Sequence, residues 1–338
     1  MRRERVMFIT GDYNRRSYNC YSGNVCYLLE RKGFLLSEHM SFGLCAGLGF
    51  QFELSDSVKF RAVRELHCLT EYLNGLGLKI KEKQLNGGDD FCHQIKESIS
   101  NDMPFMFQYD GFYFPFTQIY KKIHERRIAL VTGFNNSGFF VSDFIYGAYD
   151  AEIKLDDFIQ ATDKSKGACV NFTYYDVITE DIDRNSVNES NIWSAIGEVS
   201  NHFLREEKEN VLVGIKGIRG LYSAILGYRL KNENAIDCVS FSEDIKQAVI
   251  TLEHYGLFLE EIVCKKLVKE TYLDKMQICS KLFLEASDMW QIVCRLFFKL
   301  GVSASDKTME RIKVDIDKTA DMLERAFLLL DEMIKENI

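Results

Sequence analysis

The stretch NCYSGNVCYLLERKGFLLSEHMSFGLCAGLGF, residues 19–50, decides how the chain is interpreted. Cys20 stands just before a segment with helical character, residues 24–32, and a glycine-rich apolar turn follows it. The free N–H groups and the positive dipole at a helix N-terminus favour a thiolate. Most intracellular cysteines are small buried hydrophobes. This position nevertheless makes Cys20 the candidate nucleophile of an acyl transfer through a thioester.

The first half of the chain has mixed secondary-structure patterns. Helices are expected over residues 24–32, 57–76 and 91–101, and strands over 105–109, 127–134, 138–143 and 168–174. The sequence Asn135-Asn136-Ser137-Gly138 predicts a hairpin between two of these strands. We therefore expect an α+β catalytic domain over residues 1–180.

The second half changes character after a charged linker at residues 180–190. Apolar residues recur at i, i+3, i+4 and i+7, which predicts helices over residues 215–228, 245–267, 276–300 and 312–334. We expect an all-helical domain of about five helices over residues 190–338, with apolar faces that allow a homodimer.

The composition excludes several classes of protein. Hydrophobic residues make up 46% of the 338, which supports a sizeable core. The net charge of −8 disfavours nonspecific nucleic-acid binding. No apolar run is long enough to cross a membrane, and no signal peptide is expected. Ten cysteines without regular disulfide spacing predict a reducing, cytoplasmic location. We expect neither a metal nor ATP, because no zinc-site, H-E-x-x-H or P-loop pattern occurs.

Six elements stand in a specific order: Cys20, Leu28-Leu29, Gly33, Leu36-Ser37-Glu38, Phe42-Gly43-Leu44 and Gly47-Leu48-Gly49-Phe50. In this order and spacing they resemble the N-terminal domain of the butirosin-biosynthesis acyltransferase family. A looser similarity continues through residues 105–116 and 128–143, and the helical half resembles the C-terminal domain of that family. Because the family resembles papain-like cysteine peptidases, the resemblance implies a papain-like fold for residues 1–180. It also implies transfer of an acyl group through Cys20 to an amine in antibiotic or nonribosomal-peptide assembly.

A papain-like site needs a base beside the thiol. The resemblance places that base at the head of strand 128–133, where this chain has Arg127, and the nearest histidine is His124. Three interpretations stay open. His124 acts as the base from its loop, or Arg127 stabilises a Cys20 thiolate without moving protons, or the site is degenerate and binds without turnover.

The resemblance also places an orienting acid and an oxyanion hole. Asp143 ends the next strand, where the acid is expected, although a turn aspartate is an equal alternative. Asn14 lies six residues before Cys20 and would offer a side-chain amide to the oxyanion, with the Cys20 N–H as the second donor.

Besides Arg127, three residues are candidates for substrate binding. Glu38 either binds the incoming amine or braces the site, since a buried carboxylate must be paired. Asp110 either recognises the amine or forms a turn before Gly111. Tyr113 belongs to the aromatic run 112–116, which lines an acyl channel or forms ordinary core.

The sequence favours a cysteine-dependent acyltransferase or amide synthase. No ATP is needed, because a thioester donor is already activated. Its partners would be an acyl or peptidyl carrier protein with a phosphopantetheine thioester and a small-molecule amine. The alternatives are a hydrolase on the same machinery (a peptidase or thioesterase) and a catalytically degenerate binding protein, which the absence of histidine at position 127 supports.

Overall fold

The computed structural model describes residues 7–9, 17–54, 58–63, 79–163, 167–168, 170–178, 187–231, 238–303 and 305–337. The chain divides into two compact units. The sheet unit comprises residues 1–38 and 73–183, and the helical unit comprises residues 39–72 and 184–338. None of the described helices is both long enough and apolar enough to span a membrane.

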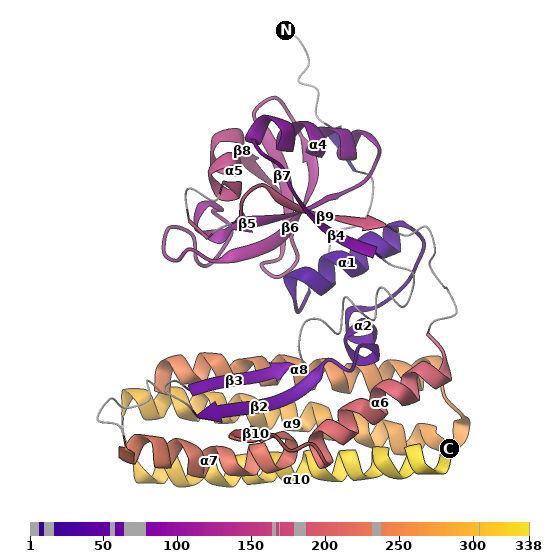
Figure 1. Ribbon diagram of the computed structural model, residues 1–338, viewed down its shortest axis with the longest axis vertical. Coiled ribbons are helices and arrows are strands. Elements are labelled where there is room, and N and C mark those ends of the chain that lie inside the picture. Colours follow the sequence, from indigo (N-terminus) through magenta and orange to yellow (C-terminus); the bar gives the residue numbers. More distant parts are fainter. Residues whose placement is uncertain are drawn as a thin grey trace. The chain divides into compact units, whose positions relative to one another are not determined.

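The sheet unit is built on an antiparallel sheet with the order β4-β9-β5-β6-β7-β8, and β1 pairs with β6 (Figure 1). Its strands are β1 (Met7–Phe8), β4 (Lys79–Gln84), β5 (Phe105–Asp110), β6 (Arg126–Phe134), β7 (Gly138–Asp143), β8 (Ala148–Lys154) and β9 (Thr173–Ile178). Its helices are α1 (Cys20–Arg31), α4 (Gly88–Ser100), α5 (Leu155–Thr162) and the short 3₁₀ helix η1 (Gly111–Tyr113).

Local sequence explains most of these elements. The expected strands at β5, β6 and β7 are confirmed, and so is the hairpin, where the Asn135 side chain accepts the backbone N–H groups of Ser137 and Gly138. The strand expected over residues 168–174 is wrong in its position, because β9 starts only at Thr173. Asn171 and Phe172 have φ values of 43° and 47°, so the chain turns there instead of extending.

Aromatic side chains form the core of the sheet unit. Phe91 of α4 and Phe158 of α5 are fully buried. The Phe91 ring lies 5.5 Å from that of Phe105, and the Phe158 ring lies 5.0 Å from that of Phe107. These contacts fix the two helices against β5 and thereby hold the strand ends that carry the polar site.

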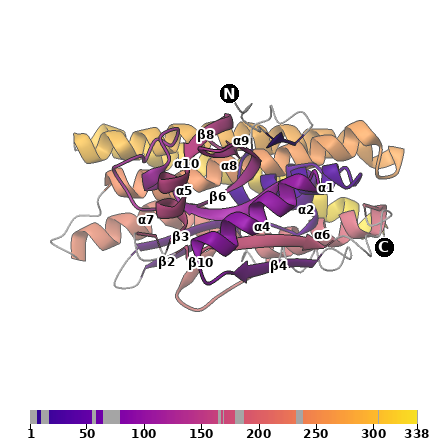
Figure 2. The ribbon, with the colours of Figure 1, turned by 90° about the horizontal axis from the view of Figure 1, so that it is seen from above.

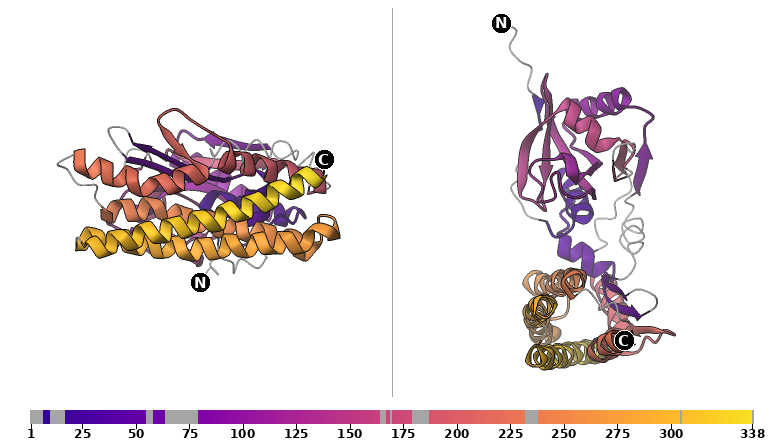
Figure 3. Two further views of the ribbon diagram at one scale, coloured as in Figure 1. Left: turned by 90° about the horizontal axis from the view of Figure 1, so that it is seen from below. Right: turned by 90° about the vertical axis from the view of Figure 1, so that its left-hand side faces the viewer.

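The helical unit contains the expected helices, but the expectation of an all-helical domain over residues 190–338 is wrong, because residues 211–213 form strand β10 in a small sheet of order β10-β2-β3. Its elements are α2 (Glu38–Leu44), whose first residue belongs to the sheet unit, β2 (Leu48–Leu54), β3 (Val58–Val63), α6 (Glu189–Leu204), β10 (Val211–Val213), α7 (Gly214–Lys231), α8 (Cys238–Lys265), α9 (Glu270–Val302) and α10 (Asp306–Asn337). The long helix α9 packs alongside both α8 and α10, as Figures 2 and 3 show from three directions.

The helix expected over residues 57–76 is wrong where the structure describes it. Residues 58–63 form β3, which pairs with β2 in the register Phe52–Phe60. The sequence VKFRAV begins with alternating apolar and polar residues, as a strand does. Pairing with β2 satisfies the backbone hydrogen-bonding groups of this strand. Residues 64–76 lie outside the described part of the chain.

The division near residue 183 falls at the expected linker, but the segment 39–72 joins the helical unit rather than residues 1–180. Long-range contacts explain this assignment. Strand β2 pairs with β10, and its Phe50 ring lies 5.8 Å from Trp290 of α9. The buried His202 of α6 accepts the Phe50 N–H through Nε2. The glycine-rich segment at residues 47–50 therefore packs in the core of the helical unit.

Candidate functional site

Cys20 is the first residue of helix α1. Asn19 caps the helix in an extended conformation, and its side chain accepts the backbone N–H groups of Tyr21 at 2.8 Å and Ser22 at 3.3 Å. Within the described part of the chain, no other residue accepts the Cys20 N–H. The sequence pattern thus positions the thiol at a helix N-terminus and leaves its own backbone donor available.

Glu38 braces the turn in front of Cys20. One carboxylate oxygen accepts the Asn19 N–H at 2.8 Å and the Ser22 hydroxyl at 2.6 Å. The other accepts the Ser17 hydroxyl at 2.7 Å and the Tyr18 N–H at 3.0 Å. Four donors on one carboxylate support the bracing alternative for Glu38, because its oxygens are already occupied by the turn.

The first turn of α1 lies against the start of β6, because the Asn24 side chain donates to the carbonyl oxygens of Cys20 at 2.6 Å and Ile128 at 3.2 Å. The charges of Arg127 and Asp143 act on the Cys20 thiol at this junction. Burial raises the pKa of the Cys20 thiol, and the charge of Asp143 raises it further. A backbone hydrogen bond from Ile128 and the charge of Arg127 act in the opposite direction. The balance leaves the pKa of this thiol above its usual value.

The Asp143 carboxylate is held from three sides. One oxygen accepts the Tyr109 hydroxyl at 2.6 Å, and the other accepts the N–H groups of Ile145 and Tyr146. Burial raises the pKa of Asp143, whereas the Tyr109 hydrogen bond lowers it. Asp143 is therefore both a turn aspartate and a neighbour of the thiol. Sequence reasoning missed Tyr109, because no motif marks it and its register opposite Arg127 is visible only in the structure.

Arg127 is a half-buried cation with one unused donor. A terminal guanidinium nitrogen donates to Glu125 at 3.0 Å, and the guanidinium carbon lies 5.5 Å from the centre of the Tyr146 ring. Its Nε atom is buried and has no hydrogen-bond partner in the described part of the chain. A guanidinium keeps its charge at every working pH and gives up no proton.

His124 pairs with a different carboxylate. Its Nδ1 lies 2.6 Å from Asp110, its ring stacks on Phe112 at 4.1 Å, and its side chain is 43% exposed. Consecutive strand residues face opposite sides, so Tyr109 is directed to Asp143 while Asp110 is directed to His124. The structure thus couples His124 to Asp110, and Asp143 to Tyr109.

Asp110 is buried and fully occupied. Besides His124, its carboxylate accepts the backbone N–H groups of Phe112, Glu125 and Ala168. This arrangement supports a role in orienting His124 and holding the turn, rather than contact with an amine substrate.

Two expected site residues remain. Tyr113 lies in η1 with its ring 6.1 Å from that of His124. Its neighbour Phe114 is fully buried and stacks on Tyr109 at 4.3 Å, so this part of the aromatic run is core. Asn14 lies outside the described residues.

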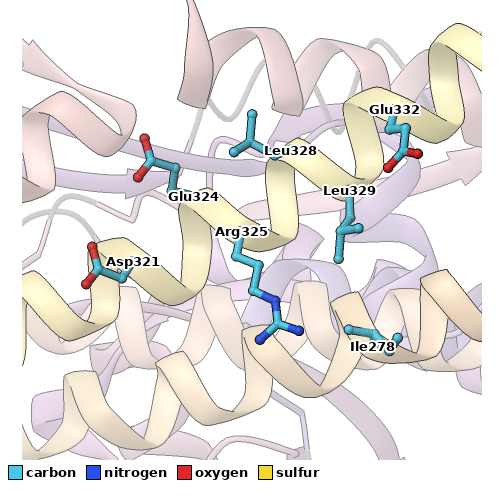
Figure 4. Close-up of a pocket in the computed structure, with 7 residues that line it drawn as sticks. All are labelled: Ile278, Asp321, Glu324, Arg325, Leu328, Leu329 and Glu332. Carbon is cyan, nitrogen blue, oxygen red and sulfur yellow. The ribbon is translucent and has the colours of Figure 1, made fainter.

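The helical unit carries a separate groove of about 430 Å³ between α9 and α10 (Figure 4). It is lined by Ile278, Asp321, Glu324, Arg325, Leu328, Leu329 and Glu332. Arg219 binds two of its carboxylates at 2.7 Å each, and Lys275 binds a third at 3.2 Å. Over the described ranges, no group of three or more His, Cys, Asp or Glu side chains is arranged to hold a metal ion.

Comparison with known proteins adds one match. The family model described as butirosin biosynthesis protein H, N-terminal, matches residues 19–144. The matched range begins one residue before Cys20, includes Arg127 and ends one residue after Asp143. No curated protein matches the chain. Over residues 19–144 the chain is therefore similar to the N-terminal domain of butirosin biosynthesis protein H.

Proposed function

We propose that the chain is a cysteine-dependent acyltransferase that forms amide bonds in natural-product biosynthesis. The observation that carries the proposal is the convergence of Cys20, Arg127 and Asp143 at the N-terminus of α1. The match to a butirosin-biosynthesis domain over the same residues supports an enzyme of a biosynthetic family.

The proposal includes a papain-like arrangement for the sheet unit. A cysteine begins a helix, a cationic residue stands near the start of β6, and an acid ends β7. This is the order that a papain-like site follows, with Arg127 in the place of the histidine. The charge of Arg127 lowers the pKa of the Cys20 thiol, which supports the interpretation in which Arg127, as a fixed cation, assists the thiolate.

The chemistry proceeds in two transfers. The Cys20 thiolate attacks the carbonyl carbon of a carrier-bound thioester, the carbon–sulfur bond to the carrier breaks, and the carrier leaves as its thiolate. An amine then attacks the Cys20 thioester, the amide forms, and Cys20 leaves as a thiolate while the amine nitrogen loses its proton to solvent. No ATP enters, because the donor thioester supplies the driving force.

The proposed partners are an acyl or peptidyl carrier protein and a small-molecule amine. The helical unit is the part that would recognise the carrier or shape the acceptor pocket.

A non-catalytic binding protein is the second candidate. It is favoured by the raised pKa of the Cys20 thiol, which disfavours the reactive thiolate in the free protein.

The test is the intact mass of the protein after exposure to a set of short acyl thioesters. We expect one acyl adduct on the parent and on Cys264→Ala, which removes an exposed thiol, and none on Cys20→Ala. An unmodified parent across varied thioesters would favour the binding protein. The adduct is then incubated with amines or with buffer alone. Release of the acyl group only to amines indicates acyl transfer, and release in buffer alone indicates hydrolysis.

A further inference from the structure

The outer face of the hairpin formed by α9 and α10 exposes four large apolar side chains. Ile278 and Ile292 of α9 are 43% and 38% exposed, and Val314 and Leu328 of α10 are 46% and 55% exposed. On each helix the two residues are separated by two heptads, which corresponds to about 21 Å along a helix axis. Both helices therefore repeat an exposed apolar position at the same spacing.

The antiparallel register of the two helices brings these positions together in pairs. Lys275 of α9 binds Glu332 of α10 at 3.2 Å, and Ile278 and Leu328 line the same groove (Figure 4). The same register, continued toward the turn between the helices, places the other two apolar residues beside each other. The face thus carries one apolar pair at each end of a stripe.

Charged residues occupy the stripe between the two apolar pairs. Within the described part of the chain, five of them make no ion pair: Lys281, Asp288, Asp317, Lys318 and Arg325. Figure 4 shows the Arg325 side chain extending from α10 across the groove toward α9. The order of these charges along each helix indicates what would pair with them.

On α10, the stripe is complementary to itself about Asp321. A two-fold axis at this position, perpendicular to the helix, sets α10 antiparallel to α10 of a second copy. Val314 then meets Leu328 of the second copy, and Leu328 meets its Val314. Arg325 likewise meets Asp317 of the second copy, so both unpaired charges gain a partner of opposite sign.

On α9, the same axis passes through Glu285, which lies beside Asp321 in the hairpin register. Ile278 meets Ile292 of the second copy, and Lys281 comes next to Asp288 of the second copy. Each acid on the axis has a cation nearby. Arg219 binds Asp321 at 2.7 Å, and Lys281 stands one turn from Glu285.

We propose that this stripe joins two copies of the chain into a two-fold symmetric dimer, through a four-helix contact made by α9 and α10 of each copy. A second copy fits the pattern because a two-fold contact uses the same patch on both sides, so that every contact occurs twice. An unrelated partner would require neither equal apolar spacing on both helices nor charges ordered about a centre. The apolar pairs supply affinity, and the charge pairs fix the register. The inference does not depend on the proposed acyl transfer.

The first test is the mass of the full chain in solution, by sedimentation velocity from about 1 to 100 µM. We expect the parent to shift from the mass of one chain toward that of two as its concentration rises. Leu328→Asp should raise the dissociation constant at least about tenfold, because a charge replaces an apolar contact twice in each dimer. Leu155→Asp is the matched control, since Leu155 of α5 is 42% exposed and lies outside the stripe, and it should dimerise like the parent.

The second test exchanges one charge pair. Arg325→Asp alone and Asp317→Arg alone each place like charges opposite one another, and each should weaken the dimer at least about tenfold. The double variant restores opposite charges, so its dissociation constant should return to within about threefold of the parent. If one of these variants loses its helical circular dichroism signal, Lys281→Asp and Asp288→Lys, alone and together, repeat the exchange on α9.

Several outcomes would overturn the proposal. A parent that stays monomeric up to about 100 µM would leave the stripe to solvent or to another protein. A dimer that Leu328→Asp leaves intact, or that Leu155→Asp weakens equally, would place the contact elsewhere. Single charge variants that weaken the dimer without rescue in the double variant would exclude the two-fold register.

Discussion

The hydroxyl of Tyr109 donates to the Asp143 carboxylate at 2.6 Å, from a side chain that is fully buried in the sheet unit. Tyr109 also lies directly opposite Arg127 in the β5–β6 ladder. One strand position thus links the acid and the cation that act on Cys20. Tyr109 is a positioning residue, because it acts through Asp143.

Replacing Tyr109 with Phe tests this link. We expect Tyr109→Phe to lower the free energy of unfolding by about 1–3 kcal/mol, because one buried carboxylate oxygen loses its donor. The pKa of Asp143 should rise further, since the Tyr109 hydrogen bond lowers it. Urea unfolding measures the stability. Tyr120→Phe is the matched control, as Tyr120 is partly exposed, and an equal loss in both variants would contradict the assignment.

The reactivity of Cys20 should depend on pH in a defined direction. Because burial raises its thiol pKa, we expect alkylation to reach half its maximal rate above about pH 8.5, the value of a free cysteine. Arg127→Gln should move this midpoint upward, because the charge of Arg127 lowers the pKa. Peptide-level mass spectrometry after timed alkylation gives the rates. A midpoint below that of free cysteine would mean that the cation outweighs burial.

The helical unit should lose stability in mild acid through His254. Burial lowers the pKa of His254 to about 3, and the charge of His39 contributes. The folded state therefore keeps the ring neutral, whereas the unfolded chain takes up a proton near pH 6.5. The free energy of unfolding should fall as pH falls from 6.5 toward 3, with His254 contributing up to about 1.4 kcal/mol per pH unit.

The His254→Gln variant isolates this contribution. Its unfolding free energy between pH 6.5 and 5 should fall less steeply than that of the parent. Denaturant titrations at half-unit intervals provide the slopes, and parallel slopes would show that another group is responsible.

Gly43 should not tolerate a side chain. A Cβ at this position would lie 2.1 Å from the ring of the buried Phe258 of α8. We expect Gly43→Ala to cost about 1–3 kcal/mol of unfolding free energy through overpacking. Gly197 of α6 has open space around it, so Gly197→Ala should stabilise by up to about 1 kcal/mol through helix propensity. Thermal melting of both variants compares the two glycines, and similar shifts would contradict the close packing of α2 on α8.

Sequence periodicity was sufficient to predict the helices and strands whose packing partners lie nearby in the chain. The hairpin at Asn135 depends on local residues and was predictable, whereas α1 starts at Cys20, four residues before the expected start at residue 24, because the Asn19 side chain caps it there. Strand β3 was not, because its partner β2 had itself been interpreted as part of a turn. Once β2 is paired with β10, which lies far along the chain, the alternation in residues 58–63 becomes a strand.

The candidate site shows the same limit. The location of Cys20 near a helix start was expected, and the place of Arg127 near the start of its strand was expected too. The partners of the two aspartates do not follow from spacing. Whether His124 pairs with Asp110 of β5 or with Asp143 of β7 depends on which side of the sheet each side chain faces, and the strand registers with β6 fix that. Tyr109 carries no motif at all.

Helix α2 joins Glu38, which belongs to the sheet unit, to residues of the helical unit. The family-matched range 19–144 is therefore not a segment that can be cut out at its ends. A fragment ending at residue 180 would keep β2 but lose β10, α8 and α9. Phe50 and Phe52 would be exposed beside an unpaired strand edge, which invites aggregation. Crystallisation trials, activity assays and gene fusions should thus retain both units, because an isolated cysteine domain would precipitate for reasons unrelated to its chemistry.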